Sequence, residues 1–369
     1  MKLFVLSKSL YWRWILRPID SNSDKRFSSD PLDEHHTYFY YLLLKYGVVD
    51  EVIVYSDRKK KNILHKIPDR LDFPEGKMRI SYDLSYAEIR ESSNQLIYCR
   101  DHVDDARLFP QHFIMCKFVA HGFPTNNGLR WIPFHIPWLC RKYKIHKSFI
   151  DLQLSEGPYN RRFFPKNIVS IDWPSLSNQK QYINAMEKKY DWICISSMNP
   201  RKRVLSLVKL ISKHKYTRVL KGCLVVNKIT SRELNASHFN KLISLINRNN
   251  LDIKIYQGVD CKEKIELLCQ SKVYVSPAAE DSGPRTVIEA GAAEVPVLAL
   301  KHHGSASFLV KNGINGELTW RFKKFPNLLK KIITNYDKYD CAVNQKLLDE
   351  ALLIKPLIKH IKRKDFSEY

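Results

Sequence analysis

The sequence lacks the cysteine patterns and the long apolar segment that mark several protein classes. Its 8 cysteines lie singly with no CxxC pair, so they indicate neither a zinc site nor a disulfide framework and fit a reducing compartment. No apolar run approaches the ~20 residues that span a bilayer. The basic, apolar N-terminus has no small-residue cleavage site, which favours a first buried strand over a signal peptide. We therefore expect a cytoplasmic protein.

Acidic residues are also scarce. The 38 Asp and Glu residues stand against 61 Lys and Arg residues, a formal net charge of +23 that attracts polyanions. Basic clusters lie at 58–61, 141–147 and 359–364. Each cluster alone fits a solvated face, whereas together they favour attraction to an anionic surface. No RNA- or DNA-binding module signature is visible, so we expect phosphate-bearing substrates and an anionic membrane surface as partners, and no nucleic acid.

The first half of the chain alternates apolar strand patterns with helical material. Its 369 residues exceed the roughly 250–300 residues at which one core stops growing, so two domains are expected. Gly47 is expected to end the first helix. Strands are expected at 2–7, 50–57, 94–100, 116–122 and 146–156, and a helix at 33–47.

Residues 166–189 lose this periodicity and are expected to form a linker. A second alternating run follows, and such alternation implies right-handed crossovers and parallel sheets. We therefore expect an α/β protein with two facing, doubly wound, Rossmann-like domains at 1–170 and 171–340, and a ligand in the cleft between them. In the second half, strands are expected at 191–197, 218–226, 251–257, 272–277 and 295–300, and helices at 203–214, 231–249, 261–270, 285–293, 325–336 and 344–363.

The stretch KVYVSPAAEDSGPRTVIEAGAAEVPVLAL, from 272 to 300, contains a candidate anion site. Gly283 turns the chain and Pro284 suits the first position of a helix, where its missing N–H would be unpaired anyway. The free backbone N–H groups of Arg285 and Thr286 would then form a positive helix terminus. This terminus suits an anion such as a diphosphate.

Two carboxylates accompany this helix start. Glu289 would lie some ~7 Å along the helix axis, beyond reach of the phosphate, where it could accept hydrogen bonds from the hydroxyls of an attached ribose. Asp281, at the loop tip, could meet another polyhydroxylated group. Taken alone, two acids at a helix start more often act only as partners of the helix dipole.

The segment EDSGPRTVIEAGAAEVPVLAL resembles the signature of GT4-type retaining glycosyltransferases with a GT-B fold. Neighbouring segments, IYQGVDCKEKIELLCQSKVYVSP, HHGSASFLVKNGINGELT and CISSMNPRKR, resemble the adjacent parts of the same family. The resemblance covers roughly residues 190–320. The matching positions are Asp281 and Glu289 for the two acids, Gly258 for a glycine, Gly304 and Ser305 for backbone that holds the donor phosphates, and Lys202 for the phosphate-binding lysine.

The resemblance is weaker over residues 1–165. There, CKFVAHG places His121 where the family often has a histidine close to the donor sugar. The sequence also departs from the family pattern. Ser197 occupies the usual arginine position, and Glu294 occupies a usual glycine. The candidates to supply the missing positive charge are Arg201, Arg203 and Arg285. The N-terminal loop, commonly glycine-rich, contains no glycine here.

The resemblance implies a mechanism. A UDP- or GDP-sugar would be the donor, with Lys202 and the helix N–H groups at Pro284–Thr286 stabilising the leaving diphosphate. The leaving phosphate itself would take the proton of the acceptor, and the resemblance implies that no enzyme nucleophile is needed. The GT-B fold that it implies needs no metal, and no cofactor is expected. Glu289 would hold the ribose, Asp281 the sugar hydroxyls, and His121 a sugar hydroxyl or the developing positive charge.

The resemblance thus predicts a metal-independent, retaining hexosyltransferase, cytoplasmic or peripheral to the membrane. Its N-terminal domain would bind a glycan or lipid-linked acceptor, and its last helix, 344–364 within the segment 341–369, would cross back onto that domain. Two alternatives are a GT-B-like epimerase or phosphorylase and a non-catalytic basic nucleic-acid-binding protein. The segment DHVDD at 101–105 also admits a metal-binding interpretation, although acids after a strand are commonplace.

Overall fold

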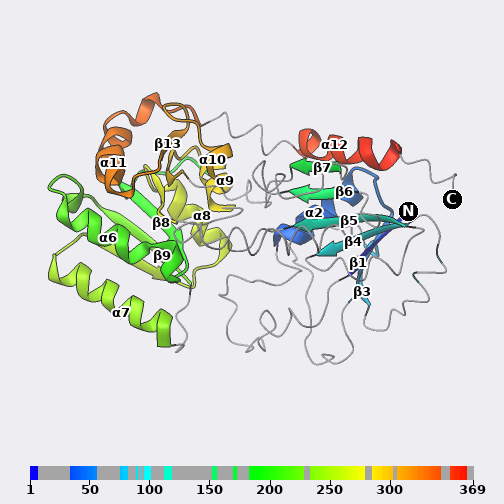
Figure 1. Cartoon of the computed structure of the whole chain (residues 1–369), viewed down its shortest axis with the longest axis horizontal. Coiled ribbons are helices and arrows are strands. Elements are labelled where there is room, and N and C mark those ends of the chain that lie inside the picture. Colours follow the sequence, from blue (N-terminus) through cyan, green and yellow to red (C-terminus); the bar gives the residue numbers. More distant parts are fainter. Residues whose placement is uncertain are drawn as a thin grey trace, which may run out of the picture.

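The computed structural model contains two parallel α/β bodies, which lie side by side in Figure 1. The structure describes residues 1–6, 34–55, 75–81, 89, 92, 95–100, 112–118, 152–155, 169–172, 183–227, 233–278, 285–301, 306–341 and 350–363.

The N-terminal body is built on a 7-stranded sheet with the order β3-β2-β1-β4-β5-β6-β7. Its strands pair in parallel throughout. The order reverses between β1 and β4, which makes that pair the switch point of the sheet. The elements are β1 (Lys2–Leu6), α2 (Glu34–Lys45), β2 (Glu51–Tyr55), β3 (Met78–Ser81), β4 (Leu96–Arg100), β5 (Phe113–Phe118), β6 (Leu152–Ser155) and β7 (Val169–Asp172).

The C-terminal body is built on a 6-stranded sheet with the order β10-β9-β8-β11-β12-β13, again parallel. Its switch point lies between β8 and β11. The strands are β8 (Trp192–Ser196), β9 (Gly222–Val226), β10 (Ile253–Gln257), β11 (Tyr274–Ser276), β12 (Val297–Leu300) and β13 (Gly316–Thr319). The helices are η4 (Pro200–Lys202), α6 (Val204–Lys213), η5 (Thr217–Val219), α7 (Glu233–Arg248), α8 (Cys261–Cys269), α9 (Arg285–Ala292), α10 (Ala306–Leu309), η6 (Phe322–Lys324), α11 (Phe325–Thr334) and η7 (Tyr336–Lys338).

The predicted alternation and the parallel sheets are confirmed, although the short helix α10 and three strands were not predicted. The expected strand 218–226 begins only at Gly222, because Thr217–Val219 form η5. β3, β7 and β13 were not predicted, and β7 falls inside the stretch expected to be a linker, at the expected domain boundary near residue 170. Each of these strands is only 4 residues long. A segment of four residues shows too little hydrophobic periodicity to identify a strand from the sequence. Because residues 169–172 form β7, the linker prediction is wrong for them.

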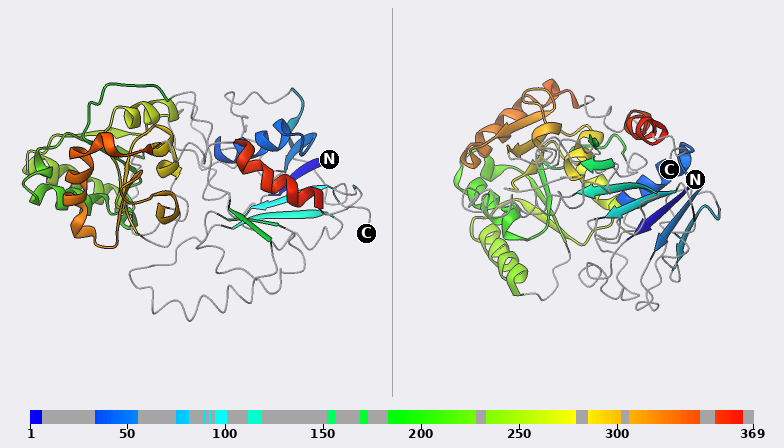
Figure 2. Two further views of the ribbon diagram at one scale, coloured as in Figure 1. Left: turned by 90° about the horizontal axis from the view of Figure 1, so that it is seen from above. Right: turned by 45° about the vertical axis from the view of Figure 1, so that its right-hand side comes forward.

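The last helix, α12 (Glu350–Arg363), lies beside the N-terminal body although it follows the C-terminal body in sequence (Figure 2). It contacts α2 and buries Ile354, Leu357 and Ile361, a spacing that puts the three side chains on one helix face. The larger of the two hydrophobic clusters includes these side chains together with residues of both sheets. Within the described residues, no helix is both long enough and apolar enough to cross a bilayer.

Candidate active site

The candidate site lies at the carboxyl ends of the C-terminal strands. β8 and β11 are neighbours at the switch point, so the segments that follow them leave the sheet side by side. The segment after β8 contains Ser197 and Lys202, and the segment after β11 leads into α9. The fold therefore brings together two parts of the chain that are some ~80 residues apart in sequence, as the doubly wound topology predicts.

Lys202 is half-buried and closes the short turn η4 just after β8. Its backbone N–H donates to the carbonyl oxygen of Asn199 at 2.9 Å. Arg203 follows with a positive φ of 55°, as the N-cap of α6, and makes no side-chain capping bond. The first backbone amides of α6 therefore have no capping side chain from this residue, and Lys202 stands beside them. A cation beside a helix start suits an anion.

Three arginines are candidates to supply the charge of the family arginine whose position Ser197 occupies. The guanidinium carbon of Arg203 lies 5.8 Å from the ring centroid of Phe322, a cation–π distance. Arg285 is exposed at the start of α9. Of Arg201, only the backbone is described, as the middle residue of η4.

α9 spans Arg285–Ala292, close to the expected 285–293, and has no acidic residue in its first turn. Thr286 is half-buried beside it. Glu289 is the fifth residue of the helix, so it lies about 6 Å along the axis from the first residue. Its neighbours Val287 and Ile288 belong to the hydrophobic core, and Glu289 itself is only 5% exposed.

Glu289 forms a buried ion pair. The Nζ atom of Lys264, on α8, donates to its Oε1 atom at 2.8 Å, and the two side chains are 9% and 5% exposed. The Oε2 atom is buried and has no hydrogen-bond partner among the described residues. An unsatisfied buried acceptor costs about 1–3 kcal/mol, and more when the group is charged. The site therefore holds an acceptor whose hydrogen-bonding capacity is unused.

Gly258 ends β10 with a positive φ of 61°, a conformation that glycine adopts without strain. Its N–H donates to the carbonyl oxygen of Val226 at 2.9 Å, which ties the end of β10 to that of β9. Asp260 then caps α8 by accepting from the N–H of Glu263 at 2.8 Å. This turn sets the direction of α8 and thereby the position of Lys264.

Lys264 was not among the residues singled out in the sequence. In KEKIELLC, it resembles the charged residues of a solvated helix face, but it is buried and paired with Glu289 of α9. The remaining candidates lie outside the described residues: His121, Asp281, Gly283, Pro284, Gly304, Ser305 and the acidic segment 101–105.

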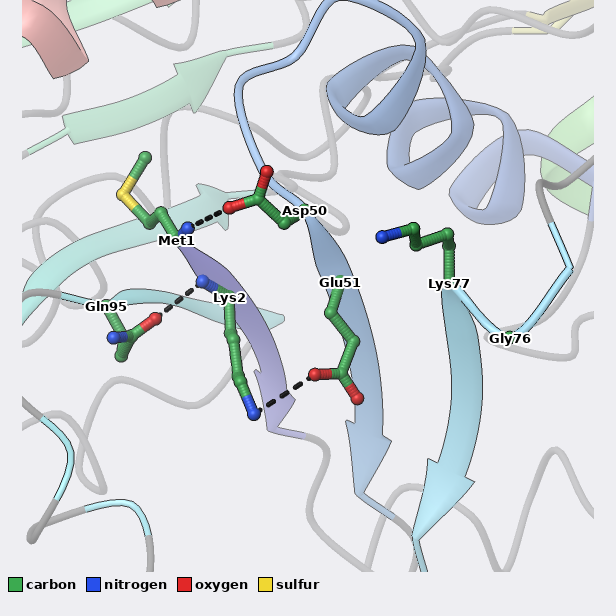
Figure 3. Close-up of a pocket in the computed structure, with 7 residues that line it drawn as sticks. All are labelled: Met1, Lys2, Asp50, Glu51, Gly76, Lys77 and Gln95. Carbon is green, nitrogen blue, oxygen red and sulfur yellow. Dashed lines mark hydrogen bonds and ion pairs between the residues drawn. The ribbon is translucent and has the colours of Figure 1, made fainter.

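A pocket of about 470 Å³ in the N-terminal body does not belong to this site. Figure 3 shows it at the amino ends of β1, β2 and β3, whereas ligands of open parallel sheets bind beyond the carboxyl ends. Both acidic side chains that line it are paired: Asp50 with the N-terminal ammonium group of Met1, and Glu51 with Lys2 Nζ at 3.1 Å and Arg79 Nε at 2.8 Å. Among the residues the structure describes, no group of three or more His, Cys, Asp or Glu side chains could hold a metal ion.

Comparison with known proteins assigns the architecture. Residues 177–345 match the family model described as glycosyl transferases group 1. HepE of Anabaena, solved in complex with UDP and glucose, has 14% identity and a TM-score of 0.65, and the match covers 98% of this chain and 100% of the HepE chain. Sucrose-phosphate synthase of Thermosynechococcus elongatus has 12% identity, a TM-score of 0.66 and full coverage of both chains.

A third structure, AviGT4, a glycosyltransferase involved in avilamycin A biosynthesis, has 13% identity and a TM-score of 0.61 over 100% of this chain and 98% of its own. No curated protein matches the sequence. Two parallel-sheet domains and these neighbours together show that the chain has the GT-B fold, and the region from 177 to 345 matches the glycosyl transferases group 1.

Proposed function

We propose that this protein is a retaining glycosyltransferase of the GT4 type, which moves a sugar from a nucleotide-diphosphate donor to a glycan or lipid-linked acceptor. The observation that carries the proposal is the buried Oε2 atom of Glu289, which lacks a hydrogen-bond partner among the described residues. It lies on the helix that follows the switch-point strand β11, within the region that matches the glycosyl transferases group 1. A ribose hydroxyl would satisfy this oxygen.

The residues around Glu289 support a diphosphate beside the ribose. Lys202 and the start of α6 lie after β8, and the start of α9 lies after β11, so two helix starts and one ammonium group approach the same edge of the sheet. As the anomeric bond breaks, these groups would stabilise the charge on the leaving diphosphate. We assign Asp281 to the hydroxyls of the donor sugar and His121 to the sugar or its developing positive charge.

We propose UDP as the first donor nucleotide to test, because HepE was solved in complex with UDP and glucose. The net charge of +23 favours a phosphorylated or lipid-linked acceptor and association with an anionic membrane surface. We propose no metal in the reaction, since ammonium groups and backbone amides can stabilise the leaving group. Activity should then persist in excess EDTA.

Nucleotide binding tests the donor site. Titration calorimetry with UDP and GDP should show binding of at least one nucleotide to the wild-type chain, weakened about tenfold or more in Glu289→Gln. Glu317→Gln is the matched control, because Glu317 is also buried and paired with a lysine, Lys331 at 2.6 Å, but lies in the amino half of the edge strand β13. The assignment of the donor site would be contradicted if neither nucleotide binds to the wild-type chain, or if both variants bind the nucleotide with wild-type affinity.

Product analysis tests the reaction. A transferase consumes the nucleotide sugar only when an acceptor is present, apart from slow hydrolysis, whereas an epimerase converts it without an acceptor. The anomeric configuration of the product, read by NMR, should match that of the donor. A product with the inverted anomeric configuration would contradict the retaining mechanism but not the proposed nucleotide site.

A further inference from the structure

The Lys264–Glu289 pair differs from the pair of Glu317 with Lys331 in one respect: among the described residues, Glu289 has a buried carboxylate oxygen without a partner, and Glu317 has none. Oε1 of Glu317 accepts from both Lys331 Nζ at 2.6 Å and Tyr339 Oη at 2.9 Å. Oε1 of Glu289 accepts from Lys264, and among the described residues Oε2 of Glu289 is the buried carboxylate oxygen that has no partner. A pair that served only to join α8 to α9 would gain stability by satisfying both oxygens.

Lys264 itself is an unusual residue to bury. It is 7% exposed, on the fourth position of α8, and its helix neighbours Ile265 and Leu268 belong to the hydrophobic core. Removing an ammonium group from water is costly unless it is paired. The 2.8 Å contact with Glu289 supplies a partner, and it also fixes which oxygen of the carboxylate faces α8.

A carboxylate on a flexible side chain can rotate, and its two oxygens are equivalent. With one oxygen held by an ammonium group on a neighbouring helix, the rotation is restricted and the second oxygen has a defined direction. This arrangement pre-organises an acceptor before the ligand arrives, which lowers the entropic cost of binding.

We propose that Lys264 is a positioning residue of the donor site: its ammonium group holds Oε1 of Glu289, so that Oε2 is directed to a hydroxyl of the donor ribose. This inference rests on the proposed function. It assigns to Lys264 a role in recognising the ribose hydroxyls, in addition to its contribution to stability.

The test compares UDP with 2′,3′-dideoxy-UDP, which lacks both ribose hydroxyls. If GDP is the nucleotide that binds, GDP and its dideoxy analogue are used instead. The wild-type chain should bind the ribonucleotide about tenfold to a hundredfold more tightly, the value of hydrogen bonds to a charged acceptor. In Lys264→Met, the preference should fall to within about threefold, mainly because ribonucleotide affinity is lost. Lys264→Gln, which keeps an N–H donor, should retain an intermediate preference.

Lys331→Met is the matched control, since it also removes the lysine partner of a buried glutamate. It should lower stability and keep the wild-type preference. If the role of Lys264 were purely structural, Lys264→Met would lower the affinities for the ribonucleotide and its dideoxy analogue equally, and their ratio would stay at the wild-type value. That result would overturn the inference. A wild-type chain that binds both nucleotides with equal affinity would overturn it too. If Lys264→Met does not fold, Lys264→Gln carries the same comparison. Failure of the proposed function is a separate result, in which the wild type binds neither UDP nor GDP.

Discussion

His112 is buried with hydrogen bonds on both ring nitrogens. Nδ1 accepts from the backbone N–H of Gln95 at 3.2 Å, so Nε2 carries the proton and donates to the carbonyl oxygen of Ile89 at 2.8 Å. Burial lowers the pKa of His112 below its usual value, against the opposing effect of the Ile89 bond. The folded ring therefore stays neutral in a pH range where the unfolded chain takes up a proton.

This arrangement predicts a pH-dependent stability. The contribution of His112 is fully present above about pH 6.5, the unfolded pKa, and is lost as the pH falls toward the lower folded pKa. Urea unfolding between about pH 7.5 and about pH 5.5 should show a smaller loss of stability in His112→Gln than in the wild type. Because the other 12 histidines are shared, only the difference between the two proteins reports on His112. Equal losses would show that this ring does not remain neutral.

Two residues, Glu294 and Lys264, show which features could be predicted from the sequence and which could not. Glu294 was recognised as a departure from a usual glycine, and the structure supplies the backbone reason. It has a φ of 55° after α9, and the bonds Glu294 N–H to Gly291 O at 3.2 Å and Val295 N–H to Ala290 O at 2.8 Å form a Schellman cap, where glycine is preferred. The pairing of Lys264 with Glu289 was not predicted, because Glu289 lies on α9, which is distant in sequence.

Among the helices and strands, the longer elements were predicted more accurately than the shorter ones. Helices such as α6 and α11 repeat apolar residues over several turns, and strands such as β8 and β12 are nearly continuous apolar runs, so both were predicted close to their observed bounds. β13 was expected to be only the end of a turn. Its four residues form a strand because they pair with β12 along its whole length.

The turn before β13 depends on one glycine. A Cβ atom on Gly316 would lie 2.1 Å from the carbonyl oxygen of Val297, whereas one on Gly313 would meet nothing within 4 Å. Gly316→Ala should therefore displace β13 from β12 and cost at least about 2 kcal/mol of unfolding free energy. Gly313→Ala, at a φ of 73°, should cost only about 1 kcal/mol. Urea unfolding of both variants checks this order, and equal costs would contradict it.

In the whole molecule, the two sheets share the same doubly wound topology, and each has its switch point next to its first strand. The alternation of elements was sufficient to predict this. The cleft expected between the domains stays a prediction, because the loops after β1 and β4, which would line it, lie outside the described residues. The position of α12 beside the N-terminal body was expected from the family resemblance and not from the alternation of elements, because its contact with α2 joins segments that are distant in sequence.

The contact of α12 with the N-terminal body can be tested separately from the donor site. Leu357 is fully buried in the cluster that includes Tyr40 and Leu43 of α2, so Leu357→Ala should cost about 2–5 kcal/mol of unfolding free energy. Lys359→Ala, at an exposed position of the same helix, should cost less than about 0.5 kcal/mol. Under native conditions, the affinity of Leu357→Ala for UDP should stay within about twofold of wild type. The reason is that α12 contacts α2, whereas Lys202, Lys264 and Glu289 all belong to the C-terminal body. A large loss of UDP affinity would mean that α12 also sets the geometry of the donor site, and an unchanged stability would mean that the α12–α2 contact is not formed in solution.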